Sequence, residues 1–183
     1  FEPSDGTIIL NGVPLQQISR NELYDHIFYI PQKPKLMNRT LYENLFYGFD
    51  ISIMNKEKNV KIAKDMMRQM KLEENIIDIF MEKMDQPLGV DGVKLSGGQR
   101  QIVWMIRAML RKPSIIIFDE PTASLDKENK KKIIDLIKIM GKDKTILIIS
   151  HDETDASFRQ IHMKQGTVIK QEKVEKQHVL SWF

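Results

Sequence analysis

The chain has 183 residues, of which 42% are hydrophobic and 29% are charged, as is usual for a globular protein with a substantial core. The 28 Lys and Arg residues against 25 Asp and Glu leave a formal net charge of +3, too small an excess to indicate nucleic acid as a partner. The absence of cysteine excludes disulfides, cysteine-ligated zinc and thiol nucleophiles. No apolar run approaches the roughly 20 residues that cross a bilayer, so we expect any membrane role to come through a partner or through further chain.

The first third of the chain predicts short strands separated by turns. Residues 1–6 have the composition of a turn between two elements, and because there is no initiator Met we expect the chain to be a fragment. A strand over residues 7–10 leads into Asn11-Gly12, a strong hairpin dipeptide. Two further elements follow, a helix that is capped by Ser19 and runs through Asp25, and a strand over Ile27–Ile30.

The middle of the chain predicts an inserted helical subdomain. Three segments have helical spacing: residues 40–46, 56–71 and 73–83. In the second of them we expect one face to be formed by Ile62, Met66, Met67 and Met70. Methionines at this spacing are typical of core packing rather than of a ligand site.

The last part of the chain predicts a parallel sheet. A helix over residues 102–110 is apolar on nearly every side, which indicates burial between layers. Strands and helices then alternate: strand 115–118, helix 127–140, strand 145–150 and helix 153–158. Continuous β-branched strands separated by helices favour a parallel sheet that is covered on both faces. Residues from about Gln171 onward have the composition of a charged tail, with helix as one option.

Polar residues follow three of the predicted strands. Because ligands bind at the carboxyl ends of parallel strands, these positions are candidate site residues. Asp119 can hold Mg²⁺ and Glu120 can polarise the water that attacks a phosphate, although the pair is also compatible with an ordinary solvated turn. His151 can donate to a terminal phosphate oxygen, or can be a structural histidine. Gln32 can contact the metal ion or the attacking water.

The segment Leu95-Ser96-Gly97-Gly98-Gln99 carries the strongest signal. Its two glycines let backbone N–H groups approach an anion closely, and Ser96 adds a hydroxyl donor. The helix that follows directs its positive N-terminus to the same place. The segment therefore predicts a phosphate-binding loop.

Together these residues resemble the nucleotide-binding domain of ABC (ATP-binding cassette) proteins over about residues 1–170. Leu95, Ser96, Gly97, Gly98 and Gln99 match the signature sequence, and residues 115–120 resemble the Walker B strand with its catalytic glutamate. The other matches are the D-loop at Ser124, Leu125 and Asp126, the switch histidine at His151 and the Q-loop glutamine at Gln32. Residues 40–48 further resemble the exporter branch of the family.

The chain also departs from the family pattern. The phosphate-binding motif GxxxxGK[ST] occurs nowhere in the 183 residues, and we expect it to lie before Phe1. Val90 stands where exporters usually have a glutamate. Ile102 and Trp104 replace an arginine and an alanine that are common after the signature, so we expect different local packing there.

The resemblance implies one α/β nucleotide-binding domain over residues 1–183. Residues 1–35 and 113–170 correspond to a RecA-like parallel-sheet lobe of a P-loop NTPase, N-terminally incomplete. Residues 36–112 correspond to the inserted α-helical subdomain that carries the signature, and residues 171–183 to a C-terminal tail.

The implied activity is ATP hydrolysis with ATP and Mg²⁺, by a motor domain that works as a head-to-tail pair with a second nucleotide-binding domain. Catalysis is implied for Glu120, His151 and Gln32, Mg²⁺ contact for Asp119 and Gln32, and ATP contact across the dimer for the signature. Asp126, with its D-loop neighbours, would bridge the two copies. Transmembrane domains are the implied further partner, which places the chain at the cytoplasmic face of a membrane; by itself the fragment is expected to be inactive.

Two other hypotheses remain. One is a soluble ABC ATPase that acts on ribosomes or nucleic acid; the compact stretch between Gln32 and the signature, without a heptad run, disfavours the chromosome-type members. The other is a degenerate cassette that regulates or dimerises without hydrolysing ATP. The presence of Glu120, His151 and the complete signature argues against it.

Overall fold

The computed structural model describes residues 3–123, 125–151 and 157–172. The chain divides into two compact units, Phe1–Ile149 and Ser150–Phe183. Helices α1 to α6 and strands β1 to β5 belong to the first unit, and strands β6 and β7 to the second.

The first unit begins with a short antiparallel pair, β1 (Ile9–Leu10) and β2 (Val13–Pro14). They are joined at Asn11 and Gly12, which both adopt positive φ angles, of 50° and 84°. Asn and Gly tolerate this left-handed conformation better than other residues, so the predicted turn is confirmed. The strand before it is shorter than the predicted 7–10.

A capping box begins the first α-helix. A short 3₁₀ helix, η1 (Leu15–Gln17), precedes α1 (Arg20–His26). The Oγ atom of Ser19 accepts a hydrogen bond from the backbone N–H of Glu22, and the Glu22 carboxylate accepts one from the N–H of Ser19. The cap satisfies N–H groups that lack partners within the helix, and the predicted helix is confirmed.

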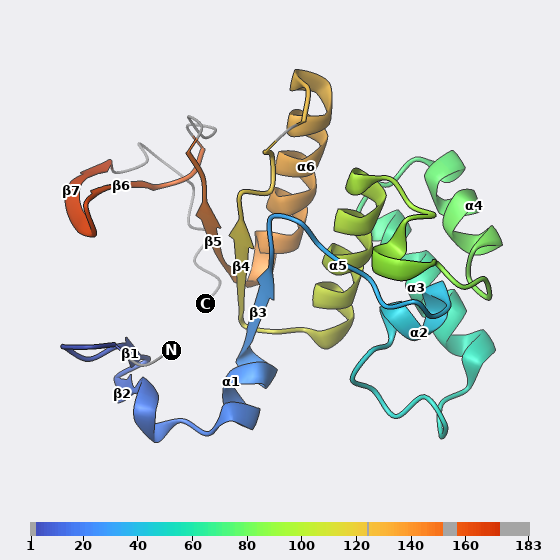
Figure 1. Ribbon diagram of the computed structural model, residues 1–183, viewed down its shortest axis with the longest axis horizontal. Helices are drawn as coiled ribbons and strands as arrows, with labels where there is room; N and C mark the ends of the chain where they lie inside the picture. Colours follow the sequence, from blue (N-terminus) through green and yellow to red (C-terminus); the bar gives the residue numbers. More distant parts are fainter. Residues whose placement is uncertain (1–2, 124, 152–156, 173–183) are drawn as a thin grey trace, which may run out of the picture. The chain divides into compact units, whose positions relative to one another are not determined.

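Three parallel strands form the main sheet, in the order β3 (Ile27–Ile30), β4 (Ile115–Asp119) and β5 (Thr145–Ile149). Ile27 pairs with Ile115, and Ile115 pairs with Thr145. The strands therefore start at one level and end at one edge, as Figure 1 shows. The predicted parallel sheet is confirmed.

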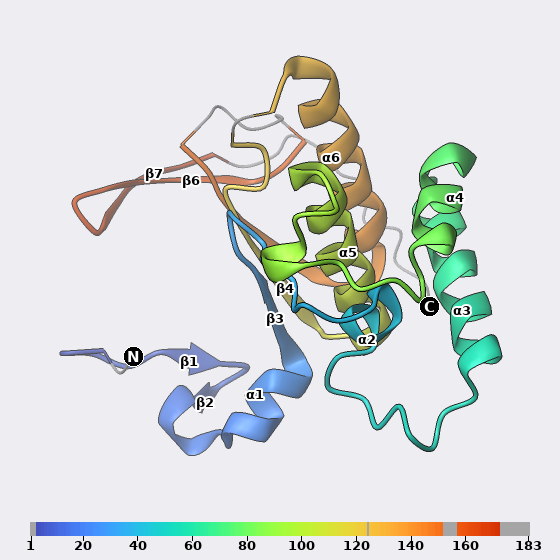
Figure 2. The same cartoon turned by 45° about the vertical axis from the view of Figure 1, so that its right-hand side comes forward.

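One face of this sheet is buried. Its side chains include Phe28, Ile30, Ile116 and Phe118. Helices α5 (Gly97–Arg111) and α6 (Lys127–Met140) lie on one side of the strands in both Figure 1 and Figure 2. On the other face, Tyr29, Leu147 and Ile149 are about half exposed, at 49%, 48% and 47%. The expectation of cover on both faces is therefore wrong for the part of the chain that the structure describes, because its helices lie on one side only.

The segment between β3 and α5 is helical, as predicted. It contains α2 (Leu41–Leu45), α3 (Lys56–Gln69) and α4 (Glu74–Glu82), followed by a 3₁₀ turn η2 (Val90–Gly92). Helix α5 contacts β3 as well as α2 and α3, so it lies between the sheet and these helices. Its buried positions include Val103, Met105, Ile106 and Ala108.

One predicted helix face is partly wrong. Met67 and Met70 are fully buried, whereas Ile62 is 40% exposed. Ala63 takes the buried position instead, four residues before Met67 and therefore directly above it on the helix. The small side chain lets α3 approach its neighbours closely.

The predicted helix 127–140 coincides with α6, which leads through η3 (Gly141–Asp143) into β5. In the second unit β6 (Gln160–Lys164) and β7 (Thr167–Glu172) form an antiparallel hairpin that the sequence analysis did not predict. Because β7 includes Gln171, the predicted tail begins within a strand, and residues 173–183 lie outside the described part of the chain. The helix predicted over 153–158 also lies mostly outside it.

Candidate functional site at the carboxyl edge of the sheet

Gln32 and Glu120 meet at the carboxyl edge of the sheet. Gln32 follows β3 and Glu120 follows β4, and the last residue of β3, Ile30, pairs with Phe118. The side-chain Nε2 of Gln32 donates a short hydrogen bond to Oε2 of Glu120. Parallel pairing in register thus brings together two residues that are 88 positions apart, as the sequence analysis expected from their places at strand ends.

The backbone turns sharply at Glu120. Its φ angle is 45°, in the left-handed region that is uncommon for a residue with a Cβ atom. Its N–H donates a 2.8 Å hydrogen bond to the carbonyl oxygen of Ile149, at the end of β5. The turn carries the chain out of the sheet and holds the carboxylate at the strand ends. Such conformations cost about 1–3 kcal/mol and occur preferentially at functional sites.

Asp119 lies beside a tyrosine that the sequence analysis did not single out. The hydroxyl group of Tyr29 donates a 2.6 Å hydrogen bond to Oδ2 of Asp119. This hydrogen bond, together with a small desolvation effect, raises the pKa of Tyr29, because ionising the phenol would abolish the donor beside a carboxylate. The sequence offers one signal for Tyr29, the hydroxyl group that it carries in the otherwise apolar strand 27–30.

The oxygen atoms of Asp119 and Gln32 suit Mg²⁺. Since the Nε2 atom of Gln32 donates to Glu120, its carbonyl oxygen is directed elsewhere and can serve as a ligand. Mg²⁺ is usually held by one or two carboxylates, with phosphate and water oxygens completing its shell. One carboxylate and one amide oxygen fit that role. No group of three or more His, Asp or Glu side chains that could form an all-protein metal site occurs among the described residues.

The signature segment forms the start of α5. Ser96 is its N-cap: its Oγ accepts a 3.2 Å hydrogen bond from the N–H of Gln99, and the Gln99 side chain accepts one of 2.9 Å from the N–H of Ser96. Beyond its chain neighbours and the backbone of its own helix, a Cβ atom at Gly98 would meet no atom of the described residues within 4 Å. The backbone of Gly98 is therefore accessible to a ligand, while the buried Leu95 anchors the segment.

A pocket of about 410 Å³ connects these parts. Gln32 lines it together with Gly97 and Gly98 of the signature and Leu125 of the predicted D-loop. The charged residues of its lining are three bases, Lys33, Lys35 and Arg100, and one acid. The acid is Asp91, which forms an ion pair with Lys35 at 3.0 Å. This charge balance favours an anion.

Two side chains of α5 attach the signature helix to neighbouring loops. Gln101 is buried and donates from Nε2 to the carbonyl oxygen of Pro121, directly after Glu120, at 2.8 Å. Trp104 donates from Nε1 to the carbonyl oxygen of Lys35 at 3.0 Å, in the loop after Gln32. Altered packing was expected at Trp104, whereas Gln101 was not predicted as a site residue. Its signal in the sequence is a glutamine on a helix that is apolar on nearly every side.

Asp126 begins α6. Its Oδ1 accepts a 2.9 Å hydrogen bond from the N–H of Asn129, and its Oδ2 accepts one of 2.7 Å from the Asn129 side chain. These hydrogen bonds, the backbone one first, lower the pKa of Asp126. Its neighbour Ser124 lies outside the described residues. The Asp126 carboxylate thus has a role within this chain, as the N-cap of α6.

His151 lies in the second unit. The structure therefore brings together Gln32, Glu120, the signature glycines and Leu125, with Asp119 next to them in the chain. The role of His151 at this site stays a prediction.

Comparison with known proteins identifies the family. Residues 1–123 match the family described as ABC transporter, and the chain belongs to that family. The Transport/processing ATP-binding protein ComA of Streptococcus pneumoniae (strain ATCC BAA-255 / R6) is 35% identical over 177 residues, which cover 94% of this chain and 23% of that protein. The ATP-dependent lipid A-core flippase of Alcanivorax borkumensis is 32% identical over 173 residues, covering 93% of this chain and 29% of the flippase.

A solved structure shares the fold. The chain superposes on a bacterial Atm1-family ABC exporter with ATP bound, with a TM-score of 0.76 and 24% sequence identity, over 93% of this chain and 29% of the exporter. The chain spans less than a third of the length of the relatives it matches. None of its described helices combines the length and the apolarity needed to cross a membrane.

Proposed function

We propose that this chain is the ATP-binding and ATP-hydrolysing motor domain of an ABC exporter. The hydrogen bond between Gln32 and Glu120 carries the proposal, because it joins the loop after β3 to the carboxylate that ends β4. The similarity to the ComA protein and to the lipid A-core flippase, which are named as ATP-binding or ATP-dependent transport proteins, supports it. The main sheet with helices α1 and α6 then corresponds to the lobe 1–35 and 113–170, and helices α2 to α5 correspond to the subdomain 36–112 that carries the signature.

In this proposal Glu120 is the general base. Its carboxylate accepts a hydrogen bond from Gln32, which would hold the carboxylate in position while it deprotonates a water molecule bound beside it. Asp119 and Gln32 would hold Mg²⁺, which neutralises charge that develops on the phosphate oxygens. His151 would donate to the terminal phosphate.

The signature would act on the ATP of a second nucleotide-binding domain. The accessible backbone of Gly98, the Ser96 hydroxyl and the first turn of α5 all offer hydrogen-bond donors, which suits a phosphate. Leu125 and Asp126 would contact that second copy. Closure of this pair of domains would drive a conformational change in transmembrane domains. The loop after Gln32 would form part of the contact with them, at the cytoplasmic face of a membrane.

The test is Glu120→Gln in the complete protein. The substitution keeps shape and an acceptor for Gln32 but removes the base, so we expect ATP turnover to fall by roughly 10²–10⁴ while ATP binding persists. Glu57→Gln, at an exposed position on α3, is the matched control and should leave turnover unchanged. Turnover of Glu120→Gln within a few-fold of the parent would refute the assignment.

A further inference from the structure

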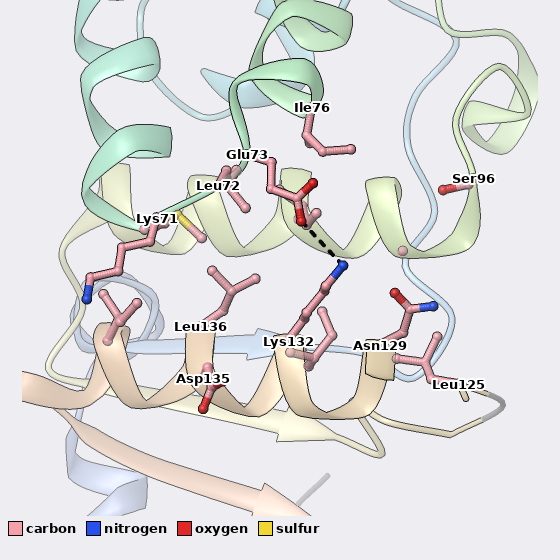
Figure 3. A pocket seen from close by; sticks show the side chains of 15 residues that line it. Lys71, Leu72, Glu73, Ile76, Ser96, Leu125, Asn129, Lys132, Asp135 and Leu136 are labelled. Atoms are coloured by element: carbon pink, nitrogen blue, oxygen red, sulfur yellow. Dashed lines mark ion pairs between the residues drawn. The ribbon is translucent and has the colours of Figure 1, made fainter. Parts of the chain in front are cut away.

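A second pocket borders the signature helix and shares Gly98 and Leu125 with the pocket at the sheet edge. Helices α5 and α6 and the link between α3 and α4 enclose a volume of about 490 Å³ (Figure 3). This size lies within the range of roughly 300–1,000 Å³ that is usual for small-molecule sites. Its lining is mainly apolar and includes Met70, Leu72, Ile76, Ile133, Leu136 and Ile139.

The apolar lining comes from separate elements. Met70, the C-cap of α3, and Leu136 on α6 are buried, at 0% and 7% exposure. Ile76 on α4 and Ile139 on α6 are half-buried. An apolar ligand in this pocket would cover the exposed parts of Ile76 and Ile139, which is favourable in proportion to the apolar area removed from water.

The charges around the pocket compensate one another. The Nζ atom of Lys132 lies 3.3 Å from Oε1 of Glu73, as Figure 3 shows, and 3.0 Å from Oε1 of Glu128. Lys71 and Asp135, both exposed, add one charge of each sign. An ionic ligand would therefore have to break an existing ion pair to gain Lys132 or Glu73 as its partner. This balance favours an uncharged ligand.

Hydrogen-bonding groups gather at one end. Figure 3 shows Ser96 and Asn129 near Leu125, away from Lys71. The Ser96 Oγ accepts from Gln99, which leaves its own hydrogen available for donation. The Asn129 Nδ2 donates to Asp126, which leaves its carbonyl oxygen as an acceptor. A hydroxyl or amide group placed here has both a donor and an acceptor within the pocket.

We propose that this pocket binds a small uncharged amphiphile, with one or two rings or a short alkyl chain against the apolar lining and a single hydroxyl or amide group at the end formed by Ser96 and Asn129. ATP does not fit this description, since it carries several negative charges. The ligand therefore differs from that of the proposed ATPase site, with which this pocket shares Ser96 and Gly98. Because Gly98 and Leu125 line both pockets, an occupant would also contact the segments expected to touch nucleotide.

Photolabelling of the complete protein tests the proposal. The probe is a trifluoromethyl-diazirine derivative of benzyl alcohol, an uncharged aromatic alcohol, and unmodified benzyl alcohol is the competitor. We expect saturable labelling, mapped by peptide mass spectrometry to residues 70–76 and 129–139. Toluene should compete roughly threefold to tenfold less well than benzyl alcohol, the usual effect of losing one neutral hydrogen bond. Labelling that does not saturate, or that maps elsewhere, would overturn the proposal.

Substitutions that fill the pocket give the second arm. Ile139→Trp places a large side chain inside from α6, and we expect labelling to fall about tenfold or more because the probe loses the burial of its ring. Ile76→Trp fills the pocket from α4, so the two variants check each other if one folds poorly. Ile62→Trp makes the same change on the exposed part of α3 and should leave labelling intact. Undiminished labelling of both filled variants would exclude this pocket. Loss of ATPase activity in Glu120→Gln has no bearing on these outcomes.

Discussion

Tyr29 and Asp119 are held together across neighbouring strands by a 2.6 Å hydrogen bond from the phenol to the carboxylate. Tyr29 pairs with Ile117, so Asp119 lies two residues further along β4 and on the same face of the sheet. The bond fixes one carboxylate oxygen and thereby the direction of the other. Tyr29 is therefore a positioning residue for the proposed Mg²⁺ ligand.

Tyr29→Phe removes this hydroxyl and keeps the ring. We expect metal affinity to fall by about tenfold, the lower end of the effect of losing an outer hydrogen bond to a metal ligand. Mn²⁺ titration followed by electron paramagnetic resonance, in the presence of a non-hydrolysable ATP analogue, measures it directly. Tyr24→Phe, on the exposed side of α1, is the control. Equal Mn²⁺ affinity of Tyr29→Phe and the parent would show that the bond does not orient Asp119.

Gln101→Leu leaves the Pro121 carbonyl without the donor that it now has. Because Gln101 is buried, we expect the free energy of unfolding to fall by about 1–3 kcal/mol, the cost of an unsatisfied buried polar group. Urea denaturation measures the change. Gln69→Leu, at an exposed position of α3, should shift it by less than about 0.5 kcal/mol. Equal stability of Gln101→Leu and Gln69→Leu would show that the hydrogen bond from Gln101 to Pro121 does not stabilise the fold.

Ser96 has two separable roles, as a helix cap and as a proposed phosphate donor. Ser96→Ala should lower stability by about 1 kcal/mol, whereas Ser96→Asp keeps a good cap. We expect Ser96→Asp nevertheless to abolish ATPase activity of the complete protein, because its carboxylate repels phosphate. Asn55→Asp adds the same charge at the cap of α3 and should be active. A fully active Ser96→Asp variant would contradict the phosphate role.

Asp126 should make stability depend on pH. Its folded pKa is lowered by the N–H and the side chain of Asn129. A depressed folded pKa means that the stabilisation is fully present above the unfolded value of about 3.8 and is lost as the pH falls through the lower folded value. Asp126→Asn keeps a capping oxygen without a titrating group.

We therefore expect the difference in unfolding temperature between the parent and Asp126→Asn to shrink as the pH falls from about 5 to about 2.5. Thermal unfolding followed by circular dichroism measures both proteins across this range. Comparing the two cancels carboxylates that titrate elsewhere, such as Glu43, whose pKa is also lowered. If the difference in unfolding temperature stayed constant across this pH range, the ionised carboxylate of Asp126 would stabilise the helix cap no more than the neutral amide does.

Local signals predicted the elements well. The limits of α6 and the position of Ser19 follow from periodicity and capping residues, which act within a few positions of the chain. The meeting of Gln32 and Glu120 followed from one topological rule, that parallel strands end at a common edge.

Contacts that depend on packing could not be predicted in the same way. The bond between Tyr29 and Asp119 requires the register of two strands that are far apart in sequence, and the apolar pocket requires the packing of α3, α4 and α6. Ile62 was misplaced because periodicity does not say which neighbour a helix face meets, and the core selects Ala63 instead. The hairpin of β6 and β7 was missed although Gln165 and Gly166 form its turn.

The attachment of the Glu120 N–H to the Ile149 carbonyl has an evolutionary consequence. A hydrogen bond between two backbone groups does not depend on the side chain at position 149. That position can therefore change among strand-forming residues while the Glu120 carboxylate stays at the sheet edge. Position 120 itself is different, since proline would delete the donor and cannot adopt its φ angle. The placement of the proposed base is thereby protected from mutation at its neighbour, and divergent members of such a lineage can vary the third strand without relocating their chemistry.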